Sequence, residues 1–134
     1  MNAPSANNRQ SWHFIVVDAR EKLNAITEVH PYSQMLKQAT LAIVVCGDTK
    51  VSESYWSQDC SAATENILLA ARALGLGTVW LGVYPRDDRV TGVSKLFNLP
   101  KHITPLAVIA VGHPAEEKGR ADRYDAAKIH KNGW

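Results

Sequence analysis

A chain of 134 residues is long enough for one domain with a hydrophobic core and too short for two ordinary domains. Its hydrophobic content of 46% and charged content of 21% are typical of a globular protein and argue against disorder. The formal net charge of +2 is too small for a nucleic-acid surface, and Asp122 interrupts the densest basic cluster, so we expect no nucleic-acid partner.

The first half of the chain predicts a turn, a strand, a helix, a short helical turn and a second strand. Both strands are apolar runs that begin or end beside turn-forming residues. The helix places Leu23 and Ile26 on one face, and the helical turn follows Pro31. In chain order, these elements are predicted at residues 2–8, 12–17, 19–29, 32–39 and 41–47.

The second half predicts two helices, each followed by a strand. Gly75 is suited to the left-handed residue that ends the first of these helices, and Leu76 to the apolar contact that accompanies it. The second helix ends before Pro100. These four elements are predicted at residues 59–74, 78–83, 86–97 and 106–111.

The four predicted strands are apolar on both faces, so we expect helices to cover both sides of the sheet. We expect one domain over residues 1–134. The polar tail, residues 115–134, has no periodicity but ends on Trp134, so we expect it to wrap another surface, such as a second copy of the chain.

Targeting and cysteine signals point to a cytoplasmic protein without a membrane partner. Residues 1–10 are polar and lack the apolar segment of a signal peptide. The longest apolar run, residues 41–46, is far too short to span a membrane. Cys46 and Cys60 do not form a disulfide framework, and we interpret each as a small buried hydrophobic residue.

Several common catalytic motifs are absent from the sequence. The five histidines show no metal-ligand spacing, so we expect no metal site. There is no nucleophile elbow or Walker loop, and the Gly75-Leu76-Gly77 segment precedes a strand instead of a helix. No nucleophile is evidently paired with a base. An enzyme with this sequence would therefore take its difficult chemistry from a bound cofactor.

Three segments suggest which cofactor that is. They are PSANNRQSW at residues 4–12, WLGVYP at 80–85, and VGHP at 111–114 followed by Lys118 and Arg120. Their order and spacing resemble the nitroreductase family of FMN-dependent oxidoreductases over essentially the whole chain. The resemblance implies an α+β fold of nitroreductase type, with a central, mainly antiparallel mixed sheet covered by helices on both sides, in a dimer.

The resemblance also assigns roles in the flavin site to the first segment. Pro4, Ser5 and Ala6 match the part that reaches the flavin of the other subunit. Asn8 and Gln10 match the polar residues of the family's turn. Ser11 replaces the usual proline, which frees one φ angle but removes no hydrogen-bond donor. Taken alone, this stretch is equally compatible with a plain turn before a strand.

Trp80, Leu81 and Gly82 match the family segment whose backbone amides face the reactive edge of the isoalloxazine. A backbone N–H can donate to this edge without introducing a titrating group, and glycine lets the backbone approach a flat ring. Without the other segments, Gly82 would be read as a glycine that ends a core strand.

Lys118 and Arg120 match the basic pair that the family places at the FMN phosphate, and Arg123 is a candidate to assist them. A solvated charged loop is the alternative. On the long helix, we interpret Asp59 as a capping residue and Glu65 as a surface or buried paired group, and neither as catalytic.

The sequence departs from the family at its start, because family members have a few dozen further residues there. Those residues form helices and an arginine-rich phosphate segment. Loss of two phosphate-binding arginines would cost about 3–6 kcal/mol, or roughly a 10²- to 10⁴-fold weaker affinity for FMN. We therefore expect an N-terminally short member with weakened retention of FMN.

The function implied by the resemblance is an FMN-dependent NAD(P)H oxidoreductase. Hydride would pass from NAD(P)H through flavin N5 to a nitroaromatic, a quinone or a similar small-molecule acceptor, by a ping-pong mechanism without a catalytic side chain. The site would be shared between the subunits of a homodimer. Two alternatives remain open: a degenerate, non-enzymatic flavin-binding dimer, and a relative that uses flavin for another reaction, such as dehalogenation or ligand fragmentation.

Overall fold

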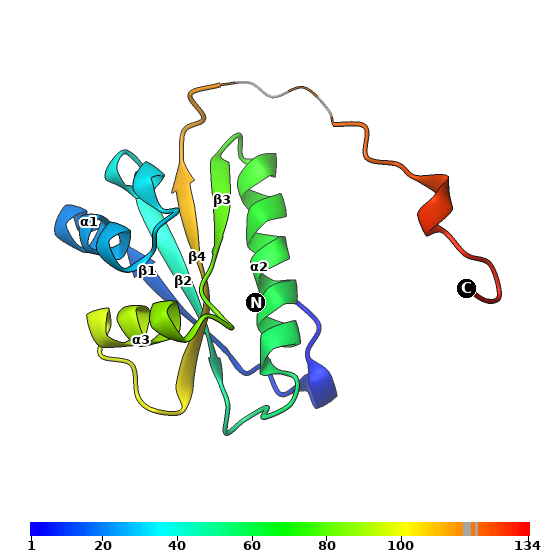
Figure 1. The fold of residues 1–134 in the computed structure, drawn as a ribbon, viewed down its shortest axis with the longest axis horizontal. Helices are drawn as coiled ribbons and strands as arrows, with labels where there is room; N and C mark the ends of the chain where they lie inside the picture. The colour runs from blue at the N-terminus through cyan, green and yellow to red at the C-terminus, as the bar shows by residue number, and fades with distance from the viewer. Residues whose placement is uncertain (117–118, 120) are drawn as a thin grey trace.

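An antiparallel sheet of four strands forms the centre of the computed structural model, which describes residues 1–116, 119 and 121–134 (Figure 1). The strand order is β1-β2-β4-β3, so β1 and β3 are the two edges. The strands are β1 (Trp12–Val17), β2 (Leu41–Asp48), β3 (Gly77–Gly82) and β4 (Ile103–Gly112), and the helices are α1 (Arg20–Val29), α2 (Trp56–Ala73) and α3 (Asp87–Leu96).

Helices cover both faces of the sheet, as the apolar strands predicted. α2 packs on one face over a core that includes Trp12, Trp56 and Ile109. α1 and α3 pack on the other face over Leu23, Val44 and Val108. The prediction of an α+β fold with a two-sided sheet is therefore confirmed. No helix in the described ranges is long and apolar enough to cross a membrane.

The end of α2 has the geometry that Gly75 predicted. Gly75 adopts φ +74°, a left-handed conformation that costs glycine little. The Leu76 N–H donates to the Ala71 carbonyl at 2.9 Å, and the Gly75 N–H donates to the Arg72 carbonyl at 3.1 Å. These are the two hydrogen bonds of a Schellman motif, which satisfy carbonyls at the end of the helix.

The tail does not pack on its own sheet. Figure 1 shows residues 121–134 standing away from the sheet and helices. Tyr124, Ile129 and Trp134 are exposed, and the Trp134 ring stacks on His130, with centroids 4.4 Å apart. The tail therefore has an uncovered aromatic end, and its packing on another surface stays a prediction.

Cys46 and Cys60 are free, fully buried thiols, and the Cys60 thiol donates to the Cys46 carbonyl over 3.4 Å. Burial raises the pKa of each thiol from 9.0 to about 12, with the charges of Cys46 and Asp59 adding to the effect at Cys60. Because thiolate is the reactive form, neither side chain is poised for redox chemistry. The interpretation of both as buried hydrophobic residues agrees with this geometry.

We expect both thiols to resist alkylation in the folded protein at pH 8, and both to be labelled after denaturation as the control. Between about pH 9 and pH 12, the unfolded thiols lose their protons while the folded thiols keep them. The free energy of unfolding should therefore fall as pH rises through this window. Iodoacetamide labelling followed by mass spectrometry measures the first effect, and rapid labelling of the native chain would contradict it.

Candidate functional site

The C-terminal end of β3 carries the predicted segment Trp80, Leu81 and Gly82. Leu81 is 4% exposed and packs into the core beneath α1 and α3. The Val83 N–H donates to the Leu106 carbonyl across the β3–β4 ladder at 3.0 Å. Because backbone groups alternate sides along an antiparallel strand, Gly82 directs its N–H and carbonyl away from β4, toward the free edge.

A hollow lies beside Gly82 on the α2 face of the sheet. A Cβ added at Gly82 would meet no atom within 4 Å, so the absent side chain leaves open space. Trp80 and Tyr84 are 39% and 45% exposed on either side of it, and Tyr84 packs edge-to-face on Trp56. Trp80 and Tyr84 also line a cavity of about 490 Å³, together with Ser57, Gln58, Ser61 and Leu106. Aromatic walls beside an outward-facing amide suit a flat, polar-edged guest.

The N-terminal segment is anchored on α2, and Asp59 is its anchor. The Ala6 N–H donates to Asp59 Oδ1 at 2.9 Å, and the Ser11 hydroxyl donates to Oδ2 at 3.4 Å. The interpretation of Asp59 as a helix cap is wrong, because α2 begins three residues earlier, with Tyr55 at the N-cap position. Glu65 is exposed, as expected for a surface group.

The turn itself is held in an unusual backbone conformation. Asn7, Asn8 and Gln10 all have positive φ, which is uncommon outside glycine. The Gln10 N–H donates to Ser5 Oγ at 3.0 Å, and Gln10 Nε2 donates to Asn8 Oδ1 at 3.2 Å. Pro4, Ser5, Ala6, Asn8 and Gln10 are therefore brought together in one tight turn. None of them lines the hollow beside Gly82 within the same chain.

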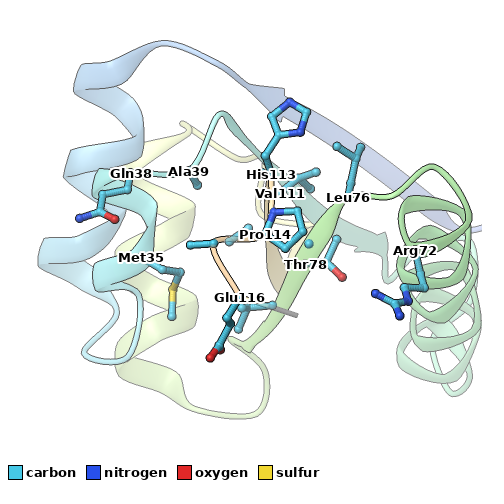
Figure 2. Close-up of a pocket in the computed structure, with 15 residues that line it drawn as sticks. Met35, Gln38, Ala39, Arg72, Leu76, Thr78, Val111, His113, Pro114 and Glu116 are labelled. Carbon is cyan, nitrogen blue, oxygen red and sulfur yellow. The ribbon is translucent and has the colours of Figure 1, made fainter. Parts of the chain in front are cut away.

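A second cavity, of about 690 Å³, lies at the opposite end of β3. Figure 2 shows Met35 and Gln38 on one side of it and Arg72 of α2 on the other, with His113 and Pro114 between. Residues 113–116 form part of its wall and lead the chain toward the predicted basic pair. Lys118 and Arg120 themselves lie outside the described residues.

The structure also adds two residues that the sequence did not suggest. His30 and Arg89 both contact the carbonyl of Gly82, from α1 and α3 respectively. They are 52 and 7 residues from Gly82 in the chain, and neither belongs to a motif. Only the packing of α1 against α3 brings them together, so no sequence signal was available.

Comparison with known proteins places the chain among flavin enzymes. The nitroreductase family model matches residues 26–113. A protein of Methanothermobacter thermautotrophicus named "Putative NADH dehydrogenase/NAD(P)H nitroreductase" is 52% identical over 136 residues, which cover 100% of this chain and 71% of that protein.

Solved structures give the same result. An FMN-dependent nitroreductase from Clostridium difficile matches with a TM-score of 0.93 and 31% identity, over 99% of this chain and 82% of that one. A Desulfovibrio desulfuricans protein described as "a putative nitroreductase in complex with fmn" matches with a TM-score of 0.80 and 28% identity, over 99% of this chain and 78% of that one.

Proposed function

This chain belongs to the nitroreductase family, and we propose that it is an FMN-dependent NAD(P)H oxidoreductase whose flavin ring lies beside Gly82. The observation that carries the proposal is the hollow at the end of an edge strand, where an amide N–H faces outward between two aromatic side chains. The names of two FMN-associated structural relatives support the choice of cofactor.

The described residues fit the ring of FMN. The cavity of about 490 Å³ combines aromatic and apolar side chains with polar side chains of α2, and Gly82 presents no Cβ to a ring above it. When bound, FMN supplies the redox chemistry by taking up hydride at N5 from NAD(P)H and passing it to an acceptor. The Gly82 N–H is placed to donate to the ring edge where negative charge accumulates on reduction, and it brings no titrating group into the site.

The phosphate end would be held by Lys118 and Arg120, as the family resemblance implies. The second cavity lies at the other end of β3, five residues and about 17 Å from Gly82. Arg72 lines this cavity and adds a described cation. Charge-assisted hydrogen bonds from such groups suit a phosphate dianion.

We propose further that two copies of the chain share the site. In this arrangement Pro4, Ser5 and Ala6 approach the flavin of the partner subunit, with Asn8 and Gln10 as polar members of the same turn. The exposed aromatic end of the tail and the exposed Leu69 and Leu74 of the α2 region supply apolar surface for the partner. Nitroaromatics, quinones or similar small acceptors would exchange with NAD(P)H at one open site, in ping-pong order.

We expect the purified chain, supplied with excess FMN and passed through a desalting column, to keep the visible absorbance of bound flavin. Anaerobic addition of NAD(P)H should bleach this absorbance, and a quinone or nitroaromatic should restore it. Sedimentation of the same sample should give the mass of a dimer. Free FMN with NAD(P)H is the control. A folded chain that gains no colour, or colour that NAD(P)H does not bleach, would contradict the proposal.

A further inference from the structure

The carbonyl of Gly82 accepts two hydrogen bonds from side chains on different helices. His30, at the end of α1, places Nε2 3.0 Å from the oxygen. Arg89, in the first turn of α3, donates from Nη1 at 2.9 Å. A carbonyl oxygen has two lone pairs, so the two donors use its full capacity and fix its direction.

His30 is held in the tautomer that donates to Gly82. The Tyr32 N–H donates to His30 Nδ1 at 3.3 Å, so Nδ1 is an acceptor and the ring hydrogen lies on Nε2. The imidazole is 2% exposed, and the Tyr32 ring packs edge-on against it with centroids 6.3 Å apart. The Arg89 guanidinium lies 5.4 Å from the centroid of the same Tyr32 ring. Tyr32 thus connects the two donors.

A glycine in the middle of α3 lets the two helices approach closely enough for this contact. A Cβ at Gly92 would lie 2.9 Å from the Cβ of Val29, the residue that precedes His30. The Arg89 Nε–H is buried and has no acceptor among the described residues. The guanidinium is therefore held at Gly82 even though one of its donors stays unpaired, which calls for a role other than stability.

We propose that His30 and Arg89 are positioning residues: by fixing the Gly82 carbonyl they fix the backbone conformation of this glycine, so that its N–H, in the preceding peptide unit, points at the bound flavin. The inference rests on the proposed function. A terminal strand glycine has wide conformational freedom, and the two hydrogen bonds remove that freedom before the cofactor arrives. Arg89 has a second effect, because its fixed positive charge close to Gly82 favours the electron-rich, reduced form of the flavin over the oxidised form.

The test compares four variants with two controls. Arg89→Met and His30→Leu remove the donors, whereas Arg89→Lys and His30→Gln keep a donor at each position. The controls are Arg86→Met, an exposed arginine at the start of α3, and His13→Leu, an exposed histidine on β1. Circular dichroism checks the fold of each. The dissociation constant of FMN is measured by fluorescence quenching, and the midpoint potential of bound FMN by dye equilibration.

We expect Arg89→Met and His30→Leu each to weaken FMN binding about tenfold. Only Arg89→Met should also shift the midpoint potential to more negative values, because only it removes a charge. Arg89→Lys should restore the potential, and His30→Gln the affinity. The controls should match the original chain in both readouts.

Two outcomes overturn the inference in distinguishable ways. If the unmodified chain binds no FMN, the proposed function fails and the inference fails with it. If the unmodified chain binds FMN but the Arg89 and His30 variants match the controls in affinity and potential, the proposed function stands and the positioning role is wrong. Lower thermal stability with unchanged affinity and potential counts as the second outcome, because it marks a purely structural role.

Discussion

A Gly82→Val chain is expected to fold normally and to lose flavin binding. Nothing lies within 4 Å of the position that a Cβ would take at Gly82, so the added Cβ meets no atom of the chain. Replacing a strand glycine should even stabilise the fold, by about 0.5–1 kcal/mol. The added methyl groups would instead occupy the hollow between Trp80 and Tyr84, where the ring is proposed to lie.

We expect the affinity for FMN to fall about 100-fold or more, which corresponds to roughly 3 kcal/mol. Fluorescence titration measures the affinity, and thermal unfolding confirms that the fold is intact. His13→Val, at an exposed position of the other edge strand, is the matched control and should bind FMN normally. A Gly82→Val chain that binds FMN as tightly as the original would exclude this hollow as the ring site.

Of all the substitutions proposed, removal of the Asp59 carboxylate should lower the free energy of unfolding the most. Asp59 is 5% exposed and accepts from the Ala6 N–H and the Ser11 hydroxyl. Asp59→Ala leaves two donors without a partner at a buried site, at a cost of about 2–4 kcal/mol. The turn at residues 4–10 should then detach from α2, so that trypsin cleaves the peptide bond after Arg9 more rapidly.

Urea denaturation and timed tryptic digestion measure the two effects. Asp59→Asn should lose much less stability, because the amide oxygen still accepts from the Ala6 N–H and the hydroxyl of Ser11 can accept from the amide NH₂. Glu65→Ala, on the exposed face of the same helix, should change neither readout. Unchanged stability in Asp59→Ala would show that the turn is held by other contacts.

Strand positions were largely predictable from the sequence because they depend on local composition. The run at 12–17 matches β1 in both bounds, the runs at 41–47 and 106–111 lie within β2 and β4, and the run at 78–83 extends one residue past β3. The start of β4 was predicted three residues late because Pro105 argues against a central strand. In the structure, Pro105 pairs with Cys46 beside a register shift between Val45 and Cys46, where the ladder is irregular and tolerates a missing donor.

Helix starts and long-range contacts were less predictable. The start of α2 at Trp56 has no capping side chain, and the buried Trp56 ring favours the extra turn through tertiary packing that a local pattern does not contain. The roles of Asp59, His30 and Arg89 likewise depend on partners far away in the chain. The cofactor roles of Pro4, Ser5, Ala6, Asn8, Gln10, Trp80, Leu81, Gly82, Lys118 and Arg120 stay predictions.

The unpaired edge of β3 has a consequence for handling the protein. Thr78 and Trp80 share the orientation of Gly82, so the outward N–H and C=O groups of these two residues and the N–H of Gly82 have no neighbouring strand among the described residues, whereas the Gly82 carbonyl is taken by His30 and Arg89. Such a row is a template for pairing with another extended chain. A cofactor lying along this edge would prevent such pairing, so FMN-free protein should precipitate sooner than FMN-bound protein. The rate of precipitation would then report how much FMN a preparation carries.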